Sequence, residues 1–166
     1  MELIRKTKFN RDRVESGGYV ALSHCVIRSQ AYGNLSAYAV KLLNDLLSQY
    51  NGLNNGDLSA PYSTMNQQRG WKSKGTLSRA IKELRGAGFI ETSRQGGRNK
   101  CSLFAVTFYA VDNCKVKLDI QPTNKPKSLW RKNEPVPDIA KLQKEKLARD
   151  DAKLMKLITD RTKLAA

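Results

Sequence analysis

Residues 69–90, RGWKSKGTLSRAIKELRGAGFI, have the signals of a helix with a marked start and a marked end. Ser73 is a typical helix N-cap, and Gly86 and Gly88 supply the positive φ angles that end a helix. Between these signals an apolar stripe repeats at helical spacing, formed by Leu77, Ala80, Ile81 and Leu84. At about 100° per residue, the opposite side carries Gly75, Arg79 and Lys82, with Ser78 at its edge. The pattern predicts a helix from Ser73 to Arg85 whose outer face is small, polar and cationic.

The sequence on both sides of this helix predicts a helix-turn-helix followed by a β-hairpin. Residues 60–70 (APYSTMNQQRG) predict a short helix that turns Tyr62, Met65 and Gln68 inward and ends at Gly70, and residues 70–72 predict a tight turn. Residues 89–94 and 101–110 predict two strands, joined by the polar tip 95–100 (QGGRNK). This is the winged-helix order, so we expect an α+β fold, a winged helix-turn-helix. The alternative is a small helical domain whose hairpin merely packs.

The flanking segments predict the rest of the chain organisation. Ser23 caps a helix that reaches residue 31 or 32, Ser36 caps a long helix over residues 37–50, and residues 57–59 form a short strand that pairs with the hairpin. Along the long helix, the predicted buried side consists of Ala39, Val40, Leu43, Leu46, Leu47 and Tyr50. Residues 111–120 form a last short strand or an extended stretch. We expect a flexible basic arm (1–18), a winged-helix domain (19–120), a Pro-rich linker (121–137) and a basic C-terminal helix (138–166).

The charge of the chain is concentrated on the central segment. The whole chain has 30 Lys and Arg against 15 Asp and Glu, a net charge of +15. Residues 69–100 contain nine basic residues and two acids, whereas residues 19–68 together with 101–120 contain four of each. Phosphate backbones are the commonest partner of such a patch, because each neutralised phosphate releases counterions. A membrane surface is a weaker alternative, since the basic helix lacks an exposed apolar face.

Several kinds of chemistry find no support in the sequence. The three cysteines, Cys25, Cys101 and Cys114, have no C-x-x-C spacing, so we expect neither disulfides nor a zinc site. The chain has one histidine, and no pair of carboxylates stands out for two-metal work. No signal peptide or membrane span is recognisable. We therefore expect a cytoplasmic, nucleoid-associated protein that is not an enzyme and needs no metal or cofactor.

Short motifs between residues 18 and 130 resemble a known family. They are GYVALS from Gly18, AYGNLS from Ala31, QYNGLNNG from Gln49, the Gly70-Trp71 pair, GFI from Gly88, RQGG from Arg94 and AVT from Ala105. Together they resemble the helix-turn-helix proteins often encoded on bacterial prophages, plasmids and integrated elements. The resemblance implies a winged-helix fold and a mobile-element setting. It does not extend to the predicted final helix.

The leading hypothesis is a sequence-specific double-stranded DNA-binding protein, a transcriptional regulator of its own element. The alternatives are a replication initiation protein that binds origin repeats, and an inhibitor that acts on a host protein–nucleic-acid complex. In the leading hypothesis, Arg79, Lys82, Ser78 and Lys74 reach base edges, Gly75 permits close approach, and Arg69, Lys72 and Ser73 hold phosphates near the start of the helix. Thr76 lies in the same first turn, and Arg94, Arg98 and Lys100 let the wing touch DNA. Leu147, Leu154, Leu157 and Leu164 mark a narrow stripe on the final helix, which Asp150 and Arg161 interrupt. A marginal helix, a short homodimer seam and a basic tail are the open alternatives for this segment.

Overall fold

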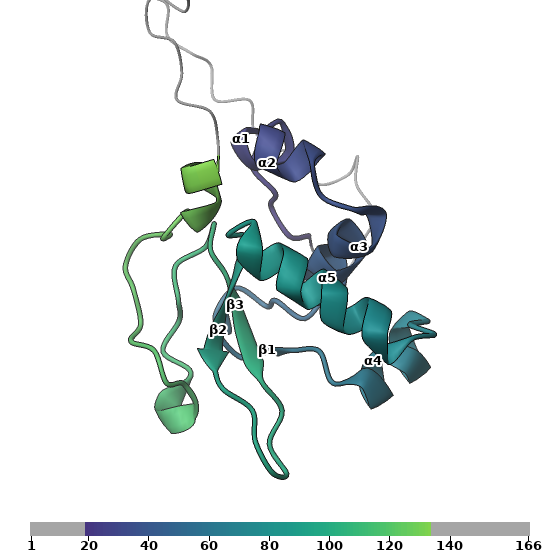
Figure 1. Cartoon of the computed structure of the whole chain (residues 1–166). Helices are drawn as coiled ribbons and strands as arrows, with labels where there is room; N and C mark the ends of the chain where they lie inside the picture. The colour runs from purple at the N-terminus through teal and green to yellow at the C-terminus, as the bar shows by residue number, and fades with distance from the viewer. Residues whose placement is uncertain (1–18, 134–166) are drawn as a thin grey trace, which may run out of the picture. The chain divides into compact units, whose positions relative to one another are not determined.

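A computed structural model of the chain describes residues 19–133, which form an α+β fold (Figure 1). The predicted arm at 1–18, the end of the predicted linker at 134–137 and the predicted helix at 138–166 lie outside the described residues. Within residues 19–133, no helix is long and apolar enough to cross a membrane. The elements in chain order are α1 (His24–Ile27), α2 (Gln30–Gly33), α3 (Ala37–Leu47), β1 (Leu58–Ser59), α4 (Tyr62–Arg69), α5 (Lys74–Gly86), β2 (Ile90–Arg94), β3 (Leu103–Val106), η2 (Lys115–Lys117) and η3 (Leu129–Asn133).

Serine side chains begin each of the first three helices. Ser23 caps α1 and Ser36 caps α3, as predicted. The single helix predicted from Ser23 to residue 31 or 32 is wrong, because Ser29 divides it. The Ser29 hydroxyl accepts from the backbone N–H of Tyr32 at 3.1 Å and donates to the carbonyl of Val26 at 2.7 Å. A serine that bonds locally to the backbone competes with a continuous helix, so α1 ends and α2 begins here.

The long helix α3 forms the base of the hydrophobic core. Ala39, Leu43, Leu46 and Leu47 are buried as predicted, and so is Leu42, which the predicted stripe omitted. Two members of that stripe, Val40 and Tyr50, are only half-buried. The helix ends at Leu47 rather than Tyr50. Asparagine side chains organise the turn that follows: Asn51 N–H donates to Asn54 Oδ1 at 2.8 Å, and Asn54 Nδ2 donates to the carbonyl of Gln49 at 2.9 Å.

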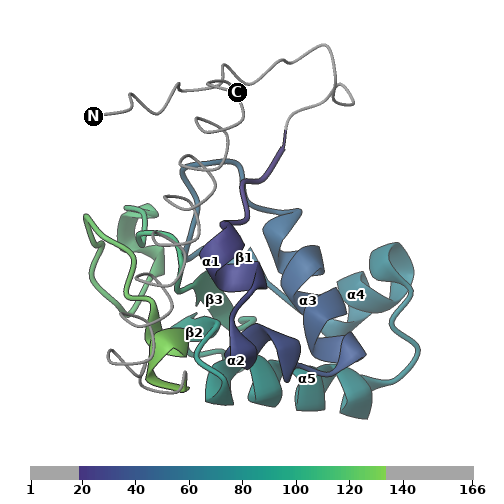
Figure 2. The same ribbon diagram turned by 90° about the horizontal axis from the view of Figure 1, so that it is seen from above.

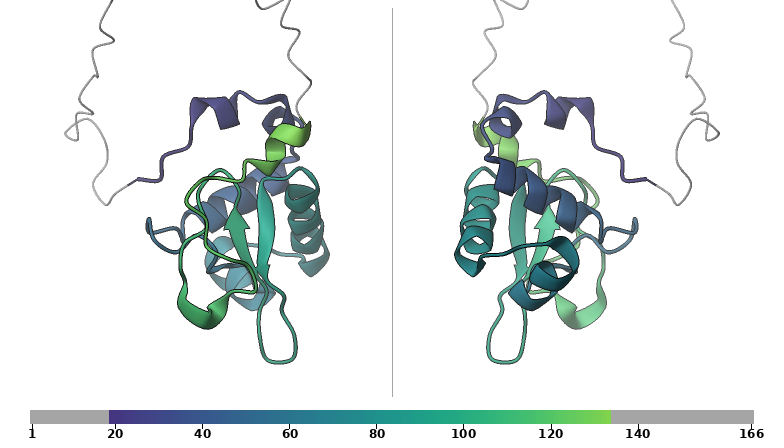
Figure 3. Two further views of the ribbon diagram at one scale, coloured as in Figure 1. Left: turned by 90° about the vertical axis from the view of Figure 1, so that its left-hand side faces the viewer. Right: turned by 90° about the vertical axis from the view of Figure 1, so that its right-hand side faces the viewer.

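The sheet has the strand order β1-β3-β2, and all its pairings are antiparallel. The predicted hairpin and its pairing with the short strand near residue 58 are confirmed, although both hairpin strands are shorter than predicted. All four residues of the central strand β3 are buried. Figures 2 and 3 show the reason: α3, α4 and α5 lie on one side of the sheet, and the chain after β3 returns along the other. The tip of the hairpin extends away from the helices (Figure 1).

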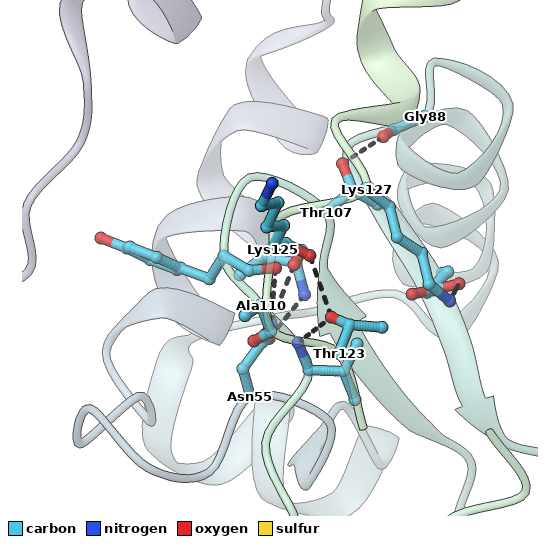
Figure 4. Close-up of polar contacts among 11 residues, drawn as sticks. Asn55, Gly88, Thr107, Ala110, Thr123, Lys125 and Lys127 are labelled. Atoms are coloured by element: carbon cyan, nitrogen blue, oxygen red, sulfur yellow. Dashed lines mark hydrogen bonds and ion pairs between the residues drawn. The ribbon is translucent and has the colours of Figure 1, made fainter. Parts of the chain in front are cut away.

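The returning chain is fastened to the sheet by polar contacts rather than by a fourth strand. Residues 111–120 contain only the 3-10 turn η2, so of the two predicted alternatives the short strand is wrong. Figure 4 shows the contacts near Thr123, whose hydroxyl accepts from the backbone N–H of Val111 at 2.9 Å. The ammonium group of Lys127 lies 2.8 Å from a carboxylate oxygen of Glu91 on β2. Much of the segment predicted as a linker is therefore packed on the sheet.

The same network holds two chain segments that lie far apart in sequence (Figure 4). Asn55 is fully buried, and its Nδ2 donates to the carbonyls of Val106 at 2.9 Å and Ala110 at 2.8 Å. Its Oδ1 accepts from the backbone N–H of Val106 at 2.8 Å. One amide side chain thus satisfies backbone groups at the end of β3, on the edge that β1 is too short to cover.

The last described residues pack against the core at the end of α5. Trp130 is 3% exposed, and its ring stacks on that of Phe89 with centroids 6.1 Å apart. Trp130 therefore packs on the core. Gly88 has φ +79°, and a Cβ there would lie 2.7 Å from the backbone of Leu129. The close approach and the positive φ both require glycine. Gly86 lacks a positive φ, since it still belongs to α5.

Candidate nucleic-acid interface

The exposed face of α5 is the most strongly cationic element surface in residues 69–100. The helix begins at its predicted cap, where the Ser73 hydroxyl accepts from the backbone N–H of Thr76 at 3.3 Å. Leu77, Ala80 and Leu84 are buried as predicted, whereas Ile81 is half-buried. The exposed residues of α5 are Lys74, Gly75, Ser78, Arg79, Lys82, Arg85 and Gly86. They include four cations and no acid.

The only acidic residue of α5 is turned away from this face. Glu83 accepts two hydrogen bonds from Ser36 at the start of α3: its Oε1 from the backbone N–H at 2.6 Å and its Oε2 from the hydroxyl at 2.7 Å. The carboxylate therefore lies at the positive end of the α3 dipole, where a negative charge is stabilised. Glu83 fixes α5 against α3 and leaves the exposed face without negative charge.

The turn between α4 and α5 is held by a buried tryptophan. Gly70 adopts the left-handed conformation, φ +68°, that ends α4. The indole N–H of Trp71 donates to Asp45 Oδ2 at 2.7 Å, and Lys41 Nζ donates to the same oxygen at 2.8 Å. The predicted inward residues of α4 are partly confirmed: Met65 is buried and Tyr62 half-buried, but Gln68 is exposed because it lies on the outer side of a helix of only eight residues.

The predicted phosphate-contacting residues of the turn differ in their surroundings. Lys72 is exposed, and its ammonium group has no ion-pair partner within the described part of the chain. Arg69 instead bonds back to α3, since its Nη2 donates to Ser48 Oγ at 2.5 Å. The Arg79 guanidinium lies 3.4 Å from Thr76 Oγ1, so Arg79 leans toward the first turn of α5.

The three basic residues of the hairpin are not equivalent. Arg98 and Lys100 are exposed at the tip, where Gly97 and Lys100 form an isolated bridge. Arg94 is half-buried, and its Nη2 donates to the carbonyl of Cys101 at 3.1 Å. Arg94 thus braces the base of the hairpin, whereas Arg98 and Lys100 are free to meet a ligand.

Two hollows flank the exposed face of α5. One, of about 330 Å³, lies at the turn and is lined by Tyr38, Lys41, Gly70, Trp71, Lys72, Ser73 and Thr76. The other, of about 540 Å³, lies between α5 and the hairpin and is lined by Lys74, Arg85 and Lys100 among others. Sequence reasoning missed Tyr38, Lys41 and Arg85 as members of this region. Only the spacing of Arg85, three helical turns after Lys74, signals that these two residues share a side of α5.

Residues 19–133 contain no group of three His, Cys, Asp or Glu residues that could hold a metal ion. No protein-family model matches the chain, and neither a search of curated proteins nor a search of solved structures gave a significant match. The resemblance to helix-turn-helix proteins of mobile elements therefore stays a prediction. The candidate interface stands on its own geometry.

Proposed function

We propose that this protein is a sequence-specific double-stranded DNA-binding protein, a transcriptional regulator of a mobile genetic element, whose described residues form a winged helix. The element order α3, β1, α4, α5, β2, β3 with the strand order β1-β3-β2 is compatible with that fold. In this proposal α4 and α5 are the helix-turn-helix, and the β2–β3 hairpin is the wing.

The single observation that carries the proposal is the composition of the exposed α5 face. That face has only cations, glycines and a serine, while the one acid of the helix is bound to Ser36. An exposed helix kept only for solubility would usually mix charges of both signs. A cationic helix surface beside a projecting hairpin suits a polyanion with grooves.

In this proposal, the residues at the centre of the exposed α5 face contact the base edges. Arg79 and Lys82 have the length and the donors for base edges, and Arg79 is the candidate for a bidentate guanine contact. Gly75 lets the backbone of α5 approach the duplex closely. Lys72, Arg98 and Lys100 contact phosphates, which sets orientation rather than sequence preference.

The test is binding to duplexes from the flanking DNA of its own gene, compared with random duplex over a range of salt concentrations. We expect specific affinity at least about a thousandfold above that for random duplex, as for other specific DNA-binding proteins. Arg79→Ala should lose about 1–3 kcal/mol of discrimination at one base pair. If the protein instead retains a host partner from nuclease-treated lysate and ignores duplex DNA, the proposal fails.

A further inference from the structure

The hollow between α5 and the β2–β3 hairpin, called here the hairpin groove, is cationic on both sides. Lys74 and Arg85 project from α5, and Lys100 from the hairpin. No acidic residue lines the groove. Among residues 19–133, none of these three side chains has an ion-pair partner. Their positive charges are therefore available to a ligand.

Apolar side chains also line the hairpin groove. Pro61, Ile81 and Phe104 line it, and the hydroxyl of Thr92, which also lines the groove, is buried without a hydrogen-bond partner in the described part of the chain. A lining that combines cations with apolar side chains fits a chain that alternates anionic groups with largely apolar ones. A sugar–phosphate backbone has this character, and phosphate oxygens and sugars take half or more of protein–DNA hydrogen bonds.

The position of the groove on α5 also matches the shape of a duplex. Lys74, Ile81 and Arg85 recur at helical spacing on one side of α5, roughly a quarter-turn from Gly75 and Lys82. A helix about 10–12 Å across fills a major groove about 12 Å wide, so the strands must pass directly beside it. The hairpin groove lies at this side of the helix.

We infer that the hairpin groove holds the sugar–phosphate backbone of one DNA strand, between Lys74 and Arg85 on α5 and Lys100 on the hairpin. The inference rests on the proposed function. It assigns Lys74 to phosphates rather than to base edges, and it adds Arg85 to the interface.

The salt dependence of binding provides the first test. Arg85→Ala and Lys100→Ala should each flatten the slope of log affinity against log salt by about one unit, to the same extent for specific and random duplex. Arg85→Lys should keep the slope. Lys125→Ala is the matched control, since Lys125 is an exposed cation on the chain that returns along the other side of the sheet (Figure 4), and its slope should not change.

Cys101 provides the second test, because its exposed side chain lines the groove. In a Cys25→Ser, Cys114→Ser protein, the Cys101 thiolate attacks the sulfenyl sulfur of a methanethiosulfonate reagent, which forms a disulfide and releases methanesulfinate. A sulfonatoethyl and a trimethylammonioethyl group of similar size can thus be attached in turn. The anionic adduct should weaken duplex binding at least about tenfold relative to the cationic one, because it repels the strand.

The outcomes separate this inference from the proposed function. Full-length protein that binds no duplex defeats the proposed function. The protein could instead bind its specific duplex with an affinity that neither the charge at Cys101 nor Arg85→Ala changes. In that case the assignment of the hairpin groove is wrong and the proposed function stands. Equal weakening by the two adducts would mean that they act by bulk, which also overturns the assignment of a phosphate backbone.

Discussion

The described residues do not require glycine at position 75, but a close approach of α5 to DNA would. It lies in the first turn of α5 without a positive φ, and a Cβ there would meet only the Ser73 hydroxyl, 3.8 Å away. Nothing in the described residues requires a glycine at this position, although glycine destabilises a helix by about 1 kcal/mol relative to alanine. At Gly88, by contrast, the backbone of the returning chain leaves no room for a side chain.

Gly75→Ala should therefore stabilise the protein and weaken DNA binding. We expect a gain of about 0.5–1 kcal/mol in the free energy of unfolding, measured with urea, because alanine restricts the unfolded chain and favours the helix. The added methyl group should lower duplex affinity, because it separates α5 from the DNA. Gly33→Ala in α2 is the control, since a Cβ there meets nothing within 4 Å. Unchanged affinity in Gly75→Ala would contradict the close approach.

Asp45 should be the most costly acid to remove from the described residues. Asp45→Ala leaves the buried Trp71 indole N–H without its acceptor and removes the ion pair with Lys41, whose ammonium group keeps its hydrogen bond to the carbonyl of Arg69. We expect a loss of about 2–3 kcal/mol in the free energy of unfolding. Asp57→Ala removes the more exposed pair with Lys117 and should cost much less than Asp45→Ala. Similar costs for the two variants would show that the contact with Trp71 contributes little.

The cysteines should differ in reactivity. Burial, followed by the charges of Asp57 and Asp112, raises the pKa of the Cys114 thiol. A raised pKa means less thiolate in the folded protein at pH 8, and the thiolate is the reactive form. Iodoacetamide should therefore modify Cys114 more slowly than exposed Cys101, as followed by peptide mass spectrometry. In urea the difference should disappear, and a difference that persisted there would point to local sequence rather than to the fold.

Among the elements, α5 is joined to α3 through Glu83. Glu83→Ala removes both acceptors from Ser36 and should cost about 1–2 kcal/mol, as does the loss of other helix caps. Glu83→Gln keeps one side-chain oxygen and should cost less. Urea unfolding checks both values. A midpoint unchanged in Glu83→Ala would mean that packing of the apolar stripe alone holds the two helices together.

Signals from neighbouring residues predicted the helices and the hairpin. The features that were missed depend on residues that lie far away in the sequence. The Ser73 cap, the apolar stripe of α5 and the hairpin are encoded within a few residues of one another, so the sequence predicts them well. The ends of β3 were not predictable, because Asn55 satisfies the backbone of residues 106–110 from about fifty positions away. The sequence alone does not distinguish Arg94 from Arg98. The difference appears only in the fold, where Arg94 donates to the Cys101 carbonyl. The role of Arg85 depends on where the hairpin lies.

For the whole molecule, the fold requires the chain as far as η3. Residues 19–133 belong to one compact unit, and Trp130 and Ser128 attach the last described residues to it. Truncation after Asn133 should leave the unfolding midpoint of this unit unchanged. Truncation after Lys127 removes Trp130 and should cost about 3–5 kcal/mol, the usual effect of losing a buried large aromatic residue. Trp130→Ala in the full chain is the companion variant, and equal stability of the two truncations would contradict the role of Trp130.

The segment after Pro137 lies outside the described residues, and its role is predicted from sequence alone. One winged helix covers a short site, so regulators of this size usually dimerise to read two half-sites. In a helix, Leu147, Leu154, Leu157 and Leu164 would share a narrow apolar stripe of a segment otherwise rich in lysine and alanine. We propose that this segment contributes to a homodimer. Protein cut after Asn133 should then sediment as a monomer and bind a half-site weakly, while the full chain sediments as a dimer and binds the paired site. A full-length chain that is monomeric at about tens of micromolar, far above common specific DNA affinities, would rule out the dimer and favour a basic tail that tethers DNA.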